Sequence, residues 1–405
     1  MITQPLRQHE GPAFTRLFTL IRSADVAFTN LETQFHDYES HAMHLSGGTY
    51  MRSDPALAQE LAWAGFDLLS RANNHAGDYG VAAMALTSQH VADVGLVQAG
   101  VGRDLDAARQ PGYWNTESAT VALISAASTF PDHARAGNAR GRIPPRPGLN
   151  PLRFQVEFVL SRRQMEQIRS IRRSLNFRTA NTGDELLWLR HQFTVGRTPR
   201  VRTTPNQLDL EEISNQVRRA NQRADHVVVS IHAHESGRNR FEPPEFLVSF
   251  AHAMIDAGAD VVVGHGPHLL RGIEIYNSKP ILYSLGNFIY QNETVDELPA
   301  DNYESLDMQP DATVEQYNQQ MLDVRDGHEW NWHSLVVVCH WQGSRLQQLK
   351  LHPLVIESTG ATRGVPRIAS LREGTKIVRD LQRHSSIFDT RIDLENFTVV
   401  VPTGE

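Results

Sequence analysis

The stretch DHVVVSIHAHE (225–235) decides the fold class, because its apolar run is typical of a buried strand and ends in two histidines and a glutamate. It is followed by EFLVSFAHAMIDAGA, whose apolar residues recur at helical spacing, and then by a second buried run, DVVVGHG (260–266). PILYSLGNF (280–288) adds another strand-like run. Strand, helix and strand in this order predict an α/β protein with parallel strands.

The same alternation fills the first third of the chain. Four strand-like runs occur there: ADVAFTNLE (24–32), FDLLSRANNH (66–75), GLVQAG (95–100) and TVALISAAS (120–128). Helices are expected in DPALAQELAWAGF, which ends near Gly65, and from about 80 to 94. Near the C-terminus, HSLVVVCHWQ (333–342) and LQQLKLHPLVI (346–356) predict an antiparallel pair.

The 405 residues are interpreted as a single domain spanning 1–405 with two insertions over its core. The first, about 131–222, opens with a passage rich in Pro, Gly and Arg, and the second, about 290–330, is polar and acidic. These segments are expected to cap the core.

Composition excludes several classes of partner. A net charge of −7 gives no general attraction for nucleic acid or for an anionic membrane, so an anionic substrate must be attracted locally. Cys339 is the only cysteine, which rules out an internal disulfide and a zinc finger. No run of 18 apolar residues and no signal-peptide pattern occurs, so we expect a cytoplasmic protein without an integral membrane segment.

Five polar clusters each follow a strand-like run, which is where open α/β sheets collect their ligands. They are Asn30-Leu31-Glu32, Asn73-Asn74-His75 with Asp78, His232-Ala233-His234-Glu235, Gly264-His265-Gly266-Pro267-His268 and Ser284-Leu285-Gly286-Asn287. Histidine, carboxylate and amide ligands suit divalent Mn, Zn or Fe, in a site of one or two ions.

These clusters, in this order, resemble the capsule-synthesis CapA (poly-γ-glutamate biosynthesis) family, a branch of the calcineurin-like metallophosphoesterases. The matching stretches are Ala24-Asp25 with Asn30-Leu31-Glu32, Ala72 to Gly80, Gly100-Val101-Gly102, His232 with Glu235, Gly258-Ala259-Asp260 leading into Gly264 to His268, and Tyr283 to Phe288. The resemblance covers about 24–130 and 225–290.

The resemblance implies a sandwich of two packed mixed sheets flanked by helices. It also implies a metal site formed by Glu32, Asn74, His232, His265 and His268. His75 would be the general acid or a contact of the transition state. Asp78 is expected to support the turn before Gly80 or to orient His75. Asn73, His234, Glu235 and Asn287 are expected beside these ligands, as residues that support them.

Two features depart from the family pattern. Its members usually open with a strand that ends in Gly-Asp, whose aspartate binds a metal, whereas here Met1-Ile2 lies about where that motif would end. Either the start is truncated, or that ligand is missing, or a group such as His9 substitutes for it. In addition, Ala233-His234 replaces the usual Trp-Gly, so His234 is either an extra ligand or a supporting residue.

Plainer interpretations exist for each of these residues. A histidine taken alone is usually structural, Glu32 could cap a helix, and Ser284 lacks the G-x-S-x-G elbow of a nucleophilic serine. The arginine-rich passage SRRQMEQIRSIRR (161–173), followed by Arg178, Arg197, Arg200 and Arg202, could bind a carboxylate or phosphate substrate. More often such a run is a solvated helix face.

The leading hypothesis is a metal-dependent hydrolase that acts on an anionic small molecule, peptide or polymer. The superfamily points to phosphoesters and the family name to γ-glutamyl amides. One alternative is a metal-assisted epimerase that acts on a peptide Cα. The other is a non-catalytic accessory protein of poly-γ-glutamate capsule synthesis.

Overall fold

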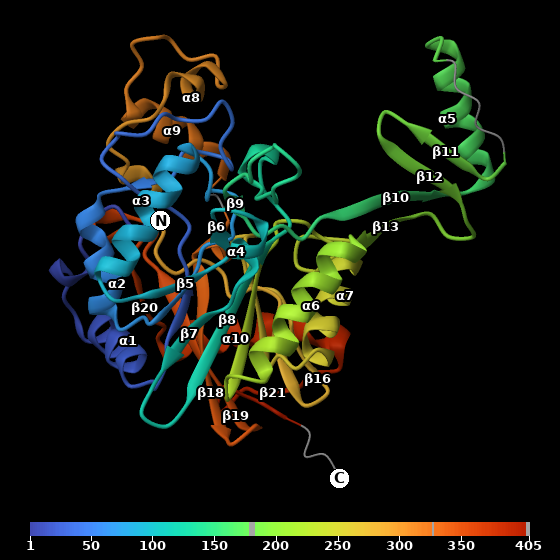
Figure 1. Cartoon of the computed structure of the whole chain (residues 1–405). Coiled ribbons are helices and arrows are strands. Elements are labelled where there is room, and N and C mark those ends of the chain that lie inside the picture. The colour runs from blue at the N-terminus through green and yellow to red at the C-terminus, as the bar shows by residue number, and fades with distance from the viewer. Residues whose placement is uncertain (178–182, 326–327, 402–405) are drawn as a thin grey trace.

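Two layers of β-sheet lie between helices in the chain (Figure 1). The computed structural model describes residues 1–177, 183–325 and 328–401. These residues form a mixed α/β protein with several sheets, in agreement with the predicted class. Within them, no helix is long and apolar enough to span a bilayer.

The first layer is a six-stranded mixed sheet in the order β16-β17-β15-β14-β8-β7. Its four central strands are parallel, and each outer strand is antiparallel to its neighbour. The bounds are β7 Gly112–Asn115, β8 Thr120–Ala127, β14 His226–His232, β15 Val261–His265, β16 Ile273–Tyr276 and β17 Lys279–Leu282. Within the predicted run at 280–288 the strand ends at Leu282, and the chain turns at Gly286, where φ is 76°.

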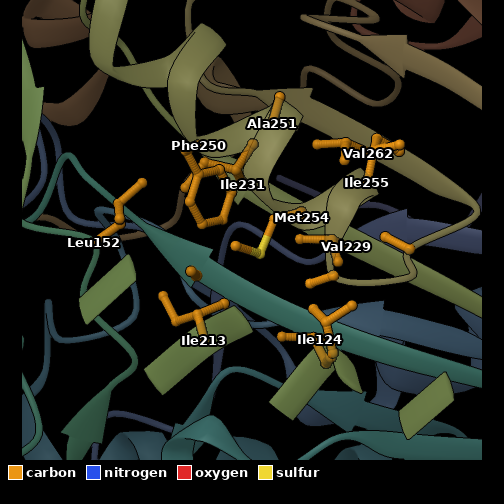
Figure 2. Packing of buried hydrophobic residues seen from close by; sticks show 14 of the residues in the cluster. Ile124, Leu152, Ile213, Val229, Ile231, Phe250, Ala251, Met254, Ile255 and Val262 are labelled. Carbon is orange, nitrogen blue, oxygen red and sulfur yellow. The ribbon is translucent and has the colours of Figure 1, made fainter. Parts of the chain in front are cut away.

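Helices α6 (Gln207–Asn221) and α7 (Glu245–Asp256) cover the outer face of this sheet. Figure 2 shows Ile213 of α6 and Phe250 and Met254 of α7 packed with the side chains that β8 and β14 direct toward these helices. The predicted insertion 131–222 thus contains a core helix at its end, since the apolar residues of α6 recur at helical spacing and are buried against the sheet.

The second layer consists of two smaller sheets. One is parallel, in the order β1-β4-β5, and the other contains the hairpin β18-β19, which confirms the predicted antiparallel pair. The bounds are β1 Phe28–Asn30, β4 Leu68–Ser70, β5 Val97–Ala99, β18 His333–Gln342, β19 Arg345–Ile356, β20 Pro366–Ile368, β21 Ile392–Asp393 and β22 Thr398–Val399.

More helices cover the outside of the second layer. Apolar residues of α1 and α2 are buried against it, and the predicted helices at 54–66 and 80–94 correspond to α2 and α3. The bounds are α1 Pro12–Arg22, α2 Ala58–Ala64, α3 Gly80–Asp93 and α10 Leu371–Ser385, the last of which packs on β19 and β16.

A cavity of about 1200 Å³ separates the two halves of the second layer. Consecutive residues 25–32 and 334–341 line it, whereas of the three valines of β15 Val261 and Val263 line it and Val262 does not. Side chains of a strand alternate between its two faces, so the cavity lies on one face of the first sheet and along the edges of β1 and β18. In the described residues, these strands pair only with β4 and β19.

Residues 154–177 and 183–205 form an arm that projects from the body (Figure 1). Its four-stranded sheet has the order β11-β12-β10-β13, and α5 packs on β10 and β12. The bounds are β10 Phe154–Leu160, α5 Arg162–Ser174, β11 Glu185–Trp188, β12 His191–Val195 and β13 Arg200–Pro205. Arg178 lies outside the described residues.

Short elements complete the chain. They are β2 Gln34–Phe35 with β3 Arg52–Ser53, β6 Val101–Gly102 with β9 Gly148–Leu149, and the helices α4 Leu105–Arg109, α8 Ala300–Glu304 and α9 Val314–Arg325. In the predicted second insertion, Asn302 and Tyr317 both contact Thr49, so this polar segment packs on the loop before β3.

A buried carboxylate joins the base of the arm to the body. Asp209 of α6 is fully buried and accepts hydrogen bonds from Arg109 Nη2 at 2.9 Å and from Arg153 Nε at 2.7 Å. It also accepts from the backbone N–H of Arg153 at 3.0 Å.

We expect Asp209→Asn to lower the free energy of unfolding by about 3–5 kcal/mol, because it removes one partner of a buried ion pair and leaves the buried Arg109 unpaired. Urea unfolding of the two proteins measures the difference. Asp93→Asn on the exposed end of α3 is the control. A loss below about 1 kcal/mol for Asp209→Asn would contradict this role of the ion pair.

Candidate metal centre

The carboxyl ends of β14 and β15 bring two histidines together. These parallel strands are aligned so that His232 is directly opposite His265. Residues 228, 230 and 232 share a face of β14, and this face is turned toward the second layer, because Val228 lines the cavity. The predicted clusters at 232–235 and 264–268 therefore lie at one edge of the sheet, on the side of the cavity.

A line of hydrogen bonds connects the histidines. His265 Nε2 is 2.7 Å from Ser230 Oγ, and His265 Nδ1 is 2.8 Å from His232 Nδ1. His232 Nε2 is in turn 3.0 Å from His234 Nε2. A neutral imidazole can donate through one ring nitrogen and accept through the other, so neutral rings can satisfy both contacts of His265 and both contacts of His232.

Burial favours the neutral form of these rings. It lowers the pKa of His265 to about 3. Burial, then the charges of His268 and His75, lower the pKa of His234 to about 2. The pKa of His232 is also well below its ordinary value, because of burial and the neighbouring His265. Neutral imidazole is the form that binds metal ions.

The loops after β1 and β4 supply oxygen atoms from the second layer. Glu32 Oε2 accepts a hydrogen bond from Asn30 Nδ2 at 3.0 Å, whereas Glu32 Oε1 is buried and has no hydrogen bond among the described residues. Asn74 Nδ2 donates to Gly47 O at 2.8 Å, and Asn74 Oδ1 is also buried without a described partner. Asn73 ties the two loops together through a bond to Leu31 O at 2.8 Å.

Glu32, His234 and His268 come together across the two layers. One ligand atom from each lies within 4.8 Å of the other two. His268 Nδ1 is 2.7 Å from Asn287 Oδ1, so Nδ1 carries the proton and Nε2 is free to bind. This fits a divalent ion, because one carboxylate and two imidazoles converge, and Oε1 of that carboxylate is buried without a hydrogen bond among the described residues.

This grouping differs in membership from the predicted ligand set. Glu32 and His268 belong to both, and His234, predicted as an extra ligand or a supporting residue, joins them. His232 lies one hydrogen bond away from His234, and both ring nitrogens of His265 face neighbours of its own cluster. The ligand roles of His232, His265 and Asn74 stay predictions.

His75 and Asp78 form a buried pair beside Glu32. His75 Nδ1 is 2.7 Å from Asp78 Oδ2, and His75 Nε2 is 4.0 Å from Glu32 Oε1. Burial lowers the pKa of His75, but Asp78 and Glu32 together outweigh it, so the pKa is raised. Asp78 also accepts from the backbone N–H groups of Gly47 and Met51, which fixes its carboxylate.

Some contacts are not predictable from the sequence pattern. Glu235 accepts hydrogen bonds from Ser128 at 2.8 Å and from Thr129 at 2.9 Å, and Thr129 also accepts from the N–H of His234. Ser230 was missed as well, although its position two residues before His232 places both side chains on one strand face. Ser128 and Thr129 carried no such signal.

The N-terminal amine of Met1 lies close to this cluster. It is buried, donates to Ile289 O at 3.1 Å, and has a pKa lowered by burial and raised to a lesser extent by Glu32. His9, the substitute suggested for the aspartate of the family pattern, packs instead against Phe14 and is not a member of the group formed by Glu32, His234 and His268.

Comparison with known proteins identifies the family. The family described as Bacterial capsule synthesis protein PGA_cap matches residues 2–292, which include every cluster described above. This chain belongs to the PGA_cap family. An uncharacterized protein of Sinorhizobium fredii, y4sH, is 35% identical to this chain. The alignment covers 98% of this chain and 90% of y4sH.

More distant relatives of this PGA_cap chain have descriptive names. The PGA biosynthesis protein CapA of Bacillus subtilis is 26% identical over 67% of this chain and 54% of its own. A probable polyglutamine synthesis accessory protein of Mycobacterium tuberculosis is 38% identical over 22% of this chain and 24% of its own. A hypothetical protein from Thermus thermophilus aligns over 87% of this chain and 95% of its own at 11% identity, with a TM-score of 0.37, too low to compare the folds further.

The buried histidines make the stability of the metal-free PGA_cap chain depend on pH. The pKa values of His232, His234 and His265 are lowered in the folded state, so below pH about 6.5 the unfolded chain binds more protons than the folded one. The stability they contribute is complete above that pH and is lost as the pH falls, by up to about 1.4 kcal/mol per pH unit for each histidine.

Urea unfolding of chelator-treated protein at pH 7 and at pH 5.5 tests this expectation. His234→Gln should reduce the loss of stability between the two values, because one proton-linked group is removed. The control is His340→Gln, which changes an exposed histidine of β18. Equal losses for the unchanged protein and His234→Gln would refute the argument.

Proposed function

We propose that this PGA_cap chain is a metal-dependent hydrolase that cleaves γ-glutamyl amide bonds of an anionic polymer. The observation that carries the proposal is the convergence of Glu32, His234 and His268, in which Oε1 of Glu32 is buried without a hydrogen bond among the described residues. A divalent ion, when bound, supplies Lewis acidity that lowers the pKa of a water molecule and polarises the scissile group.

His75 is proposed as the proton donor to the leaving nitrogen. Its raised pKa keeps it protonated to higher pH than an ordinary histidine, and its Nε2 is directed toward Glu32. Asp78 holds the ring through Nδ1, so the proton on Nε2 is available to a substrate bound at Glu32. Asp78 is therefore a positioning residue in this proposal.

The substrate class follows from the named relatives. CapA of Bacillus subtilis is called a PGA biosynthesis protein, and the likeness to metallophosphoesterases makes phosphoesters the alternative substrate. The layered arrangement, with the site at the strand ends, supports a calcineurin-like fold.

Metal analysis and an activity panel test the hydrolase together. The purified protein, supplied with Mn²⁺ or Zn²⁺, should retain at least one ion per chain and cleave γ-glutamyl peptides. Glu32→Gln and His268→Ala should lower metal affinity by at least about tenfold, since even partners of ligands have effects of that size. Glu10→Gln on an exposed glutamate is the matched control.

A second candidate function is that of a non-catalytic accessory protein. The name of the Mycobacterium tuberculosis relative favours it. Binding of much less than one ion per chain, with no turnover of γ-glutamyl peptides or phosphoesters, would support this candidate and overturn the hydrolase.

The pH profile tests the role of His75. A proton donor is active only while protonated, so kcat should fall as the pH rises through the pKa of His75. Asp78→Asn removes the charge that raises this pKa, and the basic limb should therefore move to lower pH. The profile is measured at saturating metal, with the unfolding midpoint as a check on folding.

His75→Ala is the companion variant, and it should abolish the limb together with most of the activity. A limb at the same pH in the unchanged protein and in Asp78→Asn would exclude His75 as the donor.

A further inference from the structure

The arm carries a charge opposite to that of the body. Residues 154–205 contain ten arginines, no lysine and four acidic residues, a net charge of +6. The whole chain has −7, which leaves −13 for the remaining residues. Positive charge is thus concentrated on the segment that projects farthest from the body (Figure 1).

Several arginines of the arm have structural roles. Arg162 pairs with Asp184 at 3.2 Å, Arg202 with Glu157, and Arg200 with Glu245 of α7 at 3.8 Å. Arg169 donates to the backbone oxygen of Gly183, and Arg172 is buried and donates to that of Phe177. These five arginines are thus engaged in contacts within the arm or with α7.

Four other arginines are exposed and have no acidic partner among the described residues. They are Arg163, Arg173, Arg190 and Arg197. Arg163 and Arg173 lie ten residues apart on α5, which corresponds to about 15 Å along the helix. The unpaired charges are therefore spread along the arm and do not form a single pocket.

The hairpin turn at 189–190 presents one of these arginines in a costly conformation. Trp188 of β11 is paired with His191 of β12, and the two residues between them, Leu189 and Arg190, both have positive φ, 49° and 67°. Such turns favour Asn-Gly, because larger residues are strained there. The sequence nevertheless places an exposed leucine and an exposed arginine at this tip.

The base of the arm is attached to the edge of the sheet that carries the candidate metal centre. The N–H of Leu152 donates to Ala127 O at 2.7 Å, and Ala127 is aligned with His232. On the return strand, Thr203 Oγ1 accepts from the N–H of Phe246 at the start of α7. The arm is therefore attached to the body at the end of the sheet where β14 carries His232.

We propose that the arm binds an extended polycarboxylate chain and that Arg163, Arg173, Arg190 and Arg197 are its contacts. The inference rests on the proposed function, because it names the polymer as the substrate of the same site. Guanidinium groups bind carboxylates through paired hydrogen bonds. Contacts spread over about 15 Å or more suit repeated carboxylates on one chain better than a small anion.

Binding of fluorescein-labelled poly-γ-glutamate to the full-length protein tests the proposal. Fluorescence anisotropy is recorded after chelator treatment, so that no cleavage occurs. The quadruple variant replaces all four arginines by glutamine. Each exposed contact contributes little, and together they should weaken binding about tenfold in about 50 mM NaCl. The salt dependence of binding should also become shallower.

The matched control removes four exposed arginines of the body instead. These are Arg16, Arg372, Arg379 and Arg391, all replaced by glutamine, which changes the net charge by the same amount. This variant should bind the polymer within about twofold of the unchanged protein. Circular dichroism and the unfolding midpoint verify that both variants fold.

Two results would overturn the proposal. One is an equal weakening of polymer binding in the two quadruple variants, which would show that the effect depends only on the net charge of the protein. The other is binding to phosphatidylglycerol vesicles that depends on the four arm arginines, with no such dependence for the polymer, which would assign the arm to a lipid surface.

The outcome is separable from that of the hydrolase. Polymer binding that needs the arm arginines, combined with absence of turnover, would keep the arm as a polymer site and reject the catalytic proposal. Turnover of γ-glutamyl peptides with no arm-dependent binding would do the reverse.

Discussion

The parallel alignment of β14 and β15 is the constraint on which the candidate centre depends. It sets His232 directly opposite His265 at one edge of the first sheet. A shift of one residue in either strand would turn one imidazole to the face covered by α6 and α7, where the surroundings are apolar. The apolar core under these helices therefore fixes the positions of polar groups at the strand ends.

The second layer completes the arrangement with oxygen atoms. Glu32 and Asn74 follow β1 and β4, which belong to a different sheet from the histidines, so their approach depends on packing between layers. The result joins neutral imidazoles with a carboxylate in a buried place. Neutral imidazoles and a carboxylate are groups that would bind a divalent cation in the proposed function, and protons would compete for the same ring nitrogens.

Much of this arrangement could be predicted from the sequence, and the limits have physical causes. The apolar runs ending in polar residues locate β1, β4, β8, β14 and β15, because burial and turn chemistry are local signals. The membership of His234 in the group with Glu32 and His268 could not be read in the same way, since it depends on how two sheets approach each other. Helical spacing likewise does not distinguish α5, which lies on the arm, from α6, which packs in the core.

The charge of the whole chain also conceals how charge is arranged in space. A net charge of −7 predicts weak attraction for any anion, yet it is the sum of a basic arm and an acidic body. Coulomb interactions at an ionic strength of about 0.15 M reach only about 8 Å, so a ligand near the arm experiences the arm and little of the body. The net charge of the whole chain therefore does not describe the surroundings of a ligand near the arm, where ten arginines outnumber four acidic residues.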